Sequence, residues 1–243
     1  MIELYKKEVS GFFSSLTGYI VVVIFLLTTG LFLWVLPGDL NLPDNGYAHL
    51  APLFAIAPWI FLFLTPAVTM KLFSEEKKSG TIHLLWTKPI TDLQIVLAKY
   101  FAGLSIVLIS LLPTLIYYYS VSRLASPVGN VDHGATIGSY LGLFFLAAIY
   151  VAIGTFASSL TKNQIISFLI ALTLSFFLYT GFDSLGTLTG SYEIGYFLRQ
   201  IGINEHYRSI SRGVIDSRDL IYFISMVALF IAATRTKLQS RKW

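Results

Sequence analysis

Charged side chains gather in one short stretch of this sequence, between two long apolar runs. Glu75 and Glu76 are followed directly by Lys77 and Lys78. Opposite charges this close together can pair within the chain, or with charges on another protein that rests against the stretch. The chemistry expected of these residues is therefore recognition by ion pairs, and we predict no catalytic residue among them.

The sequence lacks the common motifs that bind nucleotides or activate a nucleophile. It has no GxxxxGK[ST] loop, no GxSxG and no HExxH. Cysteine is absent, which excludes thiolate chemistry, disulfides and cysteine metal sites. The histidines are scattered without the spacing of metal ligands: His49, His83, His133 and His206. We therefore predict that the chain is not an enzyme and carries no metal or cofactor of its own.

Short helices are expected to position the charged stretch. Thr81 to Thr87 can make two helical turns, and Pro89 ends them because the residue before a proline is forced out of the helical region. A second helix can begin at Thr91, with Gln94 completing a capping box. The first of these helices has one apolar side, formed by Ile82, Leu85 and Trp86.

The composition identifies an integral membrane protein. Of 243 residues, 55% are hydrophobic and 12% charged, whereas an average soluble domain has about 25% charged residues. Residues 1–16 predict an amphipathic helix in the membrane interface. The following apolar runs predict six transmembrane helices in a single all-α domain: Tyr19–Leu36, Pro52–Phe73, Tyr100–Tyr119, Ile137–Leu160, Ile165–Phe182 and Leu220–Thr234.

Basic residues predict the orientation of these helices. Lysine and arginine concentrate on the side that holds both termini, which is then the cytoplasmic side. The residues counted there include Lys6, Lys7, Lys71, Lys77, Lys78, Lys88, Lys99, Lys162, Arg235, Lys237, Arg241 and Lys242. Apart from Lys71 near the cytoplasmic end of the second, the six predicted spans contain no Asp, Glu, Lys, Arg or His. Because ion-driven carriers need ionisable groups inside the membrane, this composition favours a protein that takes its energy from elsewhere.

Two further features lie toward the second half of the chain. Gly138 and Gly142 form a GxxxG pair that lets helices approach closely, either inside the subunit, which we favour, or between subunits. Residues 183–219 predict a pair of short external helices, one ended by Gly202 and one capped by Asn204. Three polar residues of that segment are functional candidates, although each could equally be a satisfied surface charge: His206, Arg208 and Arg212.

The order of residues in the charged stretch resembles the first cytoplasmic loop of type-2 ABC-transporter permeases. The resemblance is carried by Glu75-Glu76, two basic residues, Gly80-Thr81, two leucines, Pro89, Thr91 and Lys99. In layout it spans roughly the whole chain. Residues 206–223 are similar to the subset of permeases associated with bacterial gliding.

This resemblance implies a permease subunit of an exporter in the bacterial inner membrane, in support of gliding motility. A separate ATPase subunit would hold ATP and Mg, and a second permease half would be the same chain or a different one. Coupling to the ATPase would fall on the segment 74–91 through Glu75, Glu76, Gly80, Thr81, Ile82, Leu85, Trp86, Pro89 and Thr91. Two other classes stay open, a membrane scaffold of a cell-surface machine and an ion-driven carrier or channel. Apolar spans do not indicate the substrate.

Overall fold

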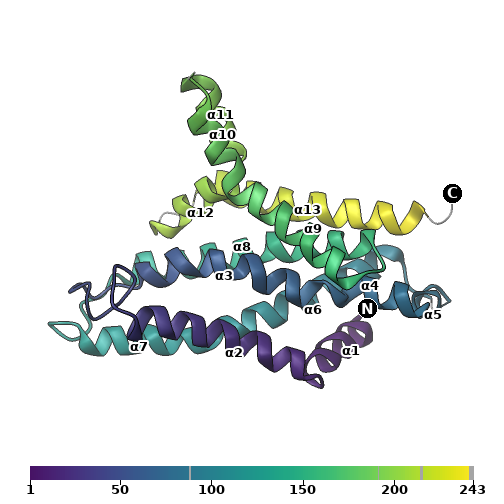
Figure 1. The fold of residues 1–243 in the computed structure, drawn as a ribbon, viewed down its shortest axis with the longest axis horizontal. Coiled ribbons are helices and arrows are strands. Elements are labelled where there is room, and N and C mark those ends of the chain that lie inside the picture. The colour runs from purple at the N-terminus through teal and green to yellow at the C-terminus, as the bar shows by residue number, and fades with distance from the viewer. Residues whose placement is uncertain (88, 191, 214–215, 241–243) are drawn as a thin grey trace.

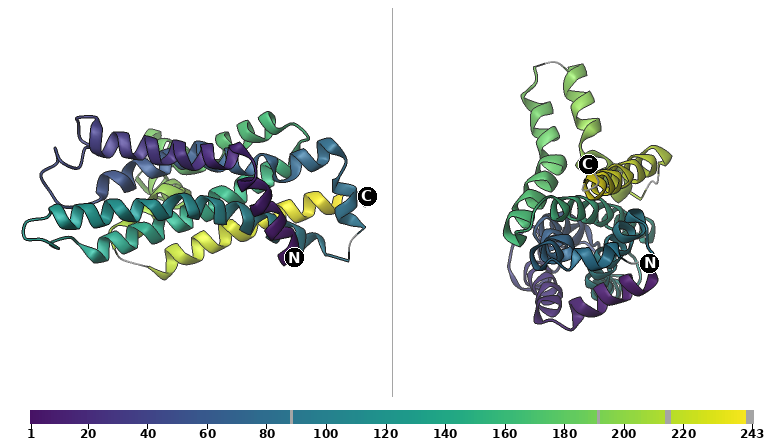
Figure 2. Two further views of the ribbon diagram at one scale, coloured as in Figure 1. Left: turned by 90° about the horizontal axis from the view of Figure 1, so that it is seen from below. Right: turned by 90° about the vertical axis from the view of Figure 1, so that its right-hand side faces the viewer.

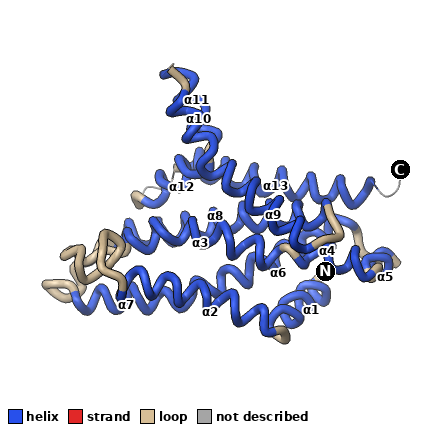
Figure 3. The backbone as a smooth tube through the Cα atoms, viewed as in Figure 1, coloured by secondary structure: helices blue, strands red, loops and turns tan. Residues whose placement is uncertain are grey.

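The computed structural model describes residues 1–87, 89–190, 192–213 and 216–240. Three basic residues counted in the orientation argument, Lys88, Arg241 and Lys242, lie outside this part of the chain. The described residues form helices and loops without a strand (Figure 3). The helices are α1 (Ile2–Phe13), α2 (Leu16–Gly30), η1 (Leu31–Val35), α3 (Ala51–Thr69), α4 (Lys71–Ser79), α5 (Ile82–Trp86), α6 (Asp92–Leu111), η2 (Leu112–Thr114), α7 (Leu115–Leu124), α8 (His133–Leu160), α9 (Gln164–Phe176), η3 (Phe177–Gly181), α10 (Phe182–Leu188), α11 (Tyr192–Ile201), α12 (Ile203–Ser211) and α13 (Ser217–Gln239).

Six helical segments of the described chain are long and apolar enough to cross a membrane, which confirms the predicted fold class. Most of them extend beyond the predicted apolar runs, because helical geometry continues into polar residues at the ends. The segments are Gly18–Val35, Ala51–Ser79, Asp92–Leu124, His133–Leu160, Gln164–Leu188 and Ser217–Gln239.

The extension of two spans corrects one prediction. The second span continues through α4, and the third begins at Asp92, so Glu75, Glu76 and Lys99 all lie on membrane-spanning helices. The spans are therefore not free of ionisable residues. The predicted boundaries stopped at the last apolar residue, whereas the helices do not.

The helix α8 lies at the centre of the bundle and packs against α3, α4, α6, α9, α12 and α13. Small residues let these helices come close. A Cβ added at Gly154 would overlap the side chain of Thr69 on α3, and one added at Gly103 on α6 would lie 3.1 Å from Val151. Close approach of this kind supplies the van der Waals contact that holds membrane helices together.

Both termini lie at one end of the bundle, together with α4 and α5 (Figure 1). The loops 36–50 and 125–132 lie at the opposite end (Figure 3). The amphipathic helix α1 crosses the end that carries the termini and packs against α6 and α2 (Figure 2).

The fifth span is not one continuous α-helix. The helix α9 passes into a π-helical turn, η3, and then into α10, which pairs with α11 as an arm that projects sideways from the bundle (Figures 1 and 2). The pair of short helices predicted after the fifth span is present as α11 and α12, and α11 ends before Gly202 as predicted. The predicted cap at Asn204 is wrong. Gly202 occupies the cap position, and the Asn204 side chain bonds the Asp183 carboxylate at 2.5 Å instead.

Candidate functional site

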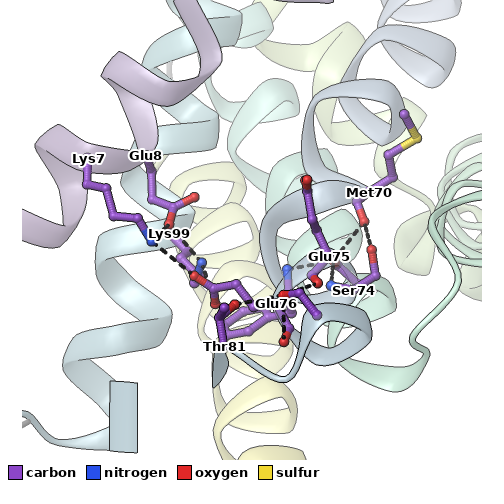
Figure 4. A network of polar contacts seen from close by, with 11 residues as sticks. Lys7, Glu8, Met70, Ser74, Glu75, Glu76, Thr81 and Lys99 are labelled. Carbon is purple, nitrogen blue, oxygen red and sulfur yellow. Dashed lines mark hydrogen bonds and ion pairs between the residues drawn. The ribbon is translucent and has the colours of Figure 1, made fainter. Parts of the chain in front are cut away.

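Four charged side chains from three helices meet at the end of the bundle that carries the termini (Figure 4). We call Lys7, Glu8, Glu76 and Lys99 the ion network. The Lys99 Nζ lies 2.9 Å from Glu8 Oε1 and 3.0 Å from Glu76 Oε2. The Lys7 Nζ lies 3.4 Å from Glu76 Oε1 and 3.9 Å from Glu8 Oε1. The network therefore joins α1 to α4 and α6 with two positive and two negative charges.

Burial makes this network energetically important. The Lys99 side chain is 0% exposed, while those of Glu76 and Glu8 are 12% and 16% exposed. A buried ammonium without a carboxylate partner is very costly, and removing one partner of a buried pair costs about 3–5 kcal/mol. The Lys99 Nζ also lies 5.2 Å from the centroid of the Phe73 ring on α4, which adds a favourable cation–π contact. The Lys7 side chain is 66% exposed and lies on the solvent side of the network.

A serine from the central helix fixes the start of α4. The Ser158 hydroxyl accepts hydrogen bonds from the backbone N–H groups of Phe73 and Ser74 at 2.9 and 3.1 Å, and donates one to the Met70 carbonyl at 3.0 Å. The Ser74 hydroxyl also donates to the Met70 carbonyl (Figure 4). Met70 separates α3 from α4, so these bonds satisfy backbone groups where the helix is interrupted. They orient α4 so that Glu76 faces Lys99.

The two neighbouring carboxylates have different environments, which corrects one prediction. Glu76 is buried and pairs with Lys7 and Lys99, not with Lys77 or Lys78. The Lys77 Nζ instead donates to the Ser159 carbonyl at the end of α8. Glu75 is exposed. Consecutive residues on a helix point about 100° apart, so only one of the two glutamates can face the bundle.

The short helix α5 also differs from its predicted role. Ile82 and Leu85, expected to face a partner protein, are only 4% and 6% exposed and belong to the core of this chain. Trp86 is half-buried and packs against the same core. The apolar side of α5 turns inward because the bundle itself offers a surface to cover it. Leu84, 63% exposed, lies on the outward side.

The turns on either side of α5 include one feature that the sequence predicts, the capping box at the start of α6. Gly80 ends α4 in the left-handed region with φ of 75°, a conformation that favours glycine. The Thr81 hydroxyl lies 2.8 Å from the Ser79 hydroxyl. Pro89 is exposed in the connection, and Thr91 and Gln94 form the predicted capping box at the start of α6. These features place α5 at the tip of a tight turn between two membrane-spanning helices.

The remaining predicted residues lie toward the opposite end of the bundle. The segment around α12 packs against Gly138 and Gly142. A Cβ added at Gly138 would lie 2.7 Å from Gly213 Cα, and a Cβ added at Gly142 would lie 3.3 Å from the Tyr207 ring. Both contacts are made within the subunit. His206 is buried, whereas Arg208 and Arg212 are exposed.

Sequence reasoning missed half of the ion network. Glu8 received no role, Lys7 was counted only for the orientation, and Lys99 only for the orientation and the family pattern. One signal was available. Glu8 follows Leu4 and Tyr5 by four and three residues, so it shares their face of α1, and Leu4 is buried while Tyr5 bonds Ser105 on α6 at 2.9 Å. A carboxylate on the buried face of a helix requires a cation opposite.

Comparison with known proteins decides the family. The sequence profile of the family described as ABC-2 family transporter protein matches residues 36–234. The chain belongs to this family. No curated protein matches the sequence. The matched range includes α4, α5, the second to fifth spans and the sixth span as far as residue 234, and it begins just after the first span.

Membership fixes the general role of the chain. It is a membrane component of an ABC transporter, a permease subunit that is not itself catalytic, and the family implies an ATPase partner and a bilayer. No cluster of His, Asp or Glu among the described residues could hold a metal ion.

Proposed function

We propose that this ABC-2 permease subunit transmits the movement of a separate ATPase to the membrane through its ion network, and that it does so in an exporter. The observation that carries the proposal is that Glu76, on the segment predicted to meet the ATPase, is buried against Lys99 of α6 and Lys7 of α1. The ATPase would bind ATP and Mg, since this chain has no P-loop.

The network makes the three helices move together. A displacement of α4 that left α6 behind would separate Glu76 from Lys99 and leave both charges buried without partners, at a cost of several kcal/mol. The hydrogen bonds of Ser158 to Phe73, Ser74 and Met70 resist the same displacement relative to α8. A force on α5 is therefore passed to the interfacial helix α1, to α6 and to the central helix α8.

The surface offered to the ATPase lies on the outer side of α5. Leu84 is 63% exposed, and a hollow of about 660 Å³ between α1 and α5 is lined by Leu4, Leu84 and Leu85 among others. Glu75 and Lys78 are exposed one turn before α5 and add charge beside this apolar position. We propose that the ATPase places an apolar side chain over Leu84 and pairs with these charges at the rim.

Two adjacent leucines provide a direct test. Leu84→Asp puts a charge on the proposed docking surface, where the loss of a central apolar anchor costs about 2 kcal/mol or more of binding. Leu85→Asp puts the same charge into the core of the permease, where an unpaired charge is among the few changes that cost about 4 kcal/mol of folding stability. The measurements are pull-down of the ATPase, ATP turnover of the complex and unfolding of the isolated permease.

The expected outcome separates the two variants. Leu84→Asp loses ATPase binding and turnover but unfolds like the unmodified chain, whereas Leu85→Asp is destabilised by itself. Leu84→Glu and Leu84→Lys serve as charge-sign controls, and both should weaken binding. If Leu84→Asp retained full binding and turnover, α5 would not be the docking surface and the proposal would fail.

The setting of this subunit is also a proposal. We place it in the bacterial inner membrane with both termini in the cytoplasm, beside a second permease half, and the similarity of residues 206–223 to gliding-associated permeases makes gliding motility the process it serves. Supporting this orientation, α1 and α4 lie at the end that carries the termini and contain Lys6, Lys71 and Lys77. Deletion of the gene should abolish surface spreading, and spreading at the unmodified rate would remove gliding from the proposal.

A further inference from the structure

A second buried ion pair lies far from the ion network, at the base of the arm. The His206 Nδ1 on α12 lies 2.7 Å from Asp219 Oδ1 at the start of α13, and His206 Nε2 lies 2.9 Å from the Gln200 carbonyl oxygen at the end of α11. The two side chains are 10% and 8% exposed. The imidazole ring also stacks on Tyr222 of α13, with 3.8 Å between ring centroids. We call His206 and Asp219 the clasp.

The geometry of the clasp fixes how many protons it holds. The Gln200 carbonyl can only accept, so Nε2 must carry a hydrogen. The contact between Nδ1 and Asp219 Oδ1 needs one more hydrogen, because a nitrogen lone pair facing a carboxylate is repulsive. Whether that hydrogen sits on the ring or on the carboxyl group, the clasp contains two hydrogens and is neutral overall. A neutral imidazole beside an ionised carboxylate carries only one hydrogen, which is one fewer than these two contacts require.

Loss of that proton would be costly at this position. The resulting carboxylate would be buried, and its other oxygen, Oδ2, has no hydrogen-bond donor among the described residues. The start of α13 supports a negative charge there, since Asp219 lies in the first turn, but it does not replace the bond to Nδ1. When the clasp holds both hydrogens, it therefore stabilises the position of α12 beside α13 and the end of α11, which we call closed. When one proton is released to water, the buried carboxylate destabilises this position.

No other ionisable side chain of the described residues pairs with His206. The elements packed against α12 are α8, α11, α13 and η3. Asp219 and Tyr222 are the ionisable groups that contact the ring, and the Tyr222 hydroxyl is occupied as a donor to the Ile201 carbonyl at 2.6 Å. The Asn204 side chain of α12 also donates to the Asp183 carboxylate of α10. The other titratable or charged residues of α12 and the elements packed against it are Glu205, Tyr207 and Arg208 of α12, Tyr192, Glu193, Tyr196 and Arg199 of α11, His133, Tyr140 and Tyr150 of α8, Tyr179 of η3, and Arg218, Arg235 and Lys237 of α13.

The helix that carries His206 also packs on the central helix α8 and contacts α3. The other side of α12 packs on Gly138 and Gly142 of α8, and the Tyr207 hydroxyl donates to the Phe54 carbonyl of α3 at 2.7 Å. Ile203 and Ile210 on α12 are 0% exposed. Without the clasp, α12 would be anchored to α13 and to the end of α11 mainly through the covalent chain and the hydroxyl of Tyr222.

We propose that the clasp is a proton-operated latch: protonated, it holds α12 against α8 and α3, and it releases α12 as the pH of the adjoining compartment rises. Imidazole is the side chain whose ordinary range of proton exchange lies between about pH 5 and pH 8. The stabilisation is fully present at the lower pH and is lost as the pH rises. This latch is independent of the ATPase docking proposed for α5.

Thiol labelling can measure the release directly. The native chain has no cysteine, and Ser211→Cys is nearly isosteric at a position whose hydroxyl lies 3.5 Å from a Cβ built on Gly142 of α8. The full chain in lipid nanodiscs would be labelled with a maleimide between about pH 6 and pH 8, a window in which histidine titrates. Rates are divided by those of Leu188→Cys, which is 81% exposed on the arm, to remove the intrinsic effect of pH on the thiol. The normalised rate should rise by up to about tenfold per pH unit, the limit for release of one proton.

Asp219→Asn is the decisive second variant. An asparagine amide can donate to a neutral Nδ1 while Nε2 still donates to Gln200, so this clasp is complete without the extra proton. Asp219→Asn should stay closed across the range, and His206→Ala should be open throughout. Glu205→Gln, a carboxylate one residue from His206, should keep the pH dependence of the unmodified chain. A flat normalised rate in the unmodified chain, or an unchanged slope in Asp219→Asn, would overturn the proposal.

Discussion

Replacing Lys99 by methionine tests the ion network most sharply. Methionine fills a similar volume without the charge, so the main loss is the pairing of Glu8 and Glu76, whose oxygens lie 2.9 and 3.0 Å from the same nitrogen. The carboxylates would then face each other, with only the exposed Lys7 nearby. Breaking a buried pair by removing one partner costs about 3–5 kcal/mol, and Lys7 should reduce this toward the lower end of that range.

The assay is equilibrium unfolding of the permease in mixed micelles, followed by ATP turnover of the complex. Lys6→Met is the matched control, because Lys6 pairs with Glu3 at 3.6 Å on the same helix α1 with side chains 66% and 89% exposed. That change should alter stability by less than about 0.5 kcal/mol. Both variants remove one lysine charge near the same end of the bundle, so net charge cannot explain a difference between them.

A double variant then isolates the pairing. Lys99→Met together with Glu8→Gln leaves Glu76 with Lys7 and should recover part of the lost stability, with a coupling energy of about 1–3 kcal/mol. ATP turnover should become independent of the transport substrate in Lys99→Met, because α4 can then move without α1 and α6. If Lys99→Met were as stable and as well coupled as Lys6→Met, the network would be neither a structural nor a mechanical link.

Other predictions follow from the backbone and from topology. Gly80→Val should cost about 1–2 kcal/mol, because a β-branched residue must adopt the left-handed conformation that ends α4; circular dichroism melting measures it, and an unchanged melting point would contradict it. Gly138→Ala should loosen α12, since its Cβ would meet backbone at 2.7 Å, whereas Gly134→Ala meets only a side-chain oxygen at 3.5 Å and should be neutral; proteolysis of the 202–213 segment compares them. Cysteine at Asn130 should react with an impermeant label on intact cells and cysteine at Lys6 should not, and the reverse pattern would invert the proposed orientation.

The sequence alone determined the class of the protein and most of its helices. Apolar runs of about the length of the hydrocarbon layer leave helices as the simplest structure, because every backbone group must be bonded within the segment. The local signal of Thr91 with Gln94 also fixed the start of α6 without reference to distant residues, and Gly202 likewise marked the end of α11. The order of residues around Gly80 was enough to indicate the permease family.

Tertiary structure decided which charges work together. Lys7, Glu76 and Lys99 are distant in sequence, and nothing local shows that α1 lies across α6 so that their side chains meet. The inward turn of Leu85 and the bend of the fifth span into the arm likewise depend on which surfaces the bundle leaves available. Helix ends follow from hydrogen bonds within a few residues, whereas burial and ion pairing depend on how helices pack, and one chain's local pattern is compatible with several such packings.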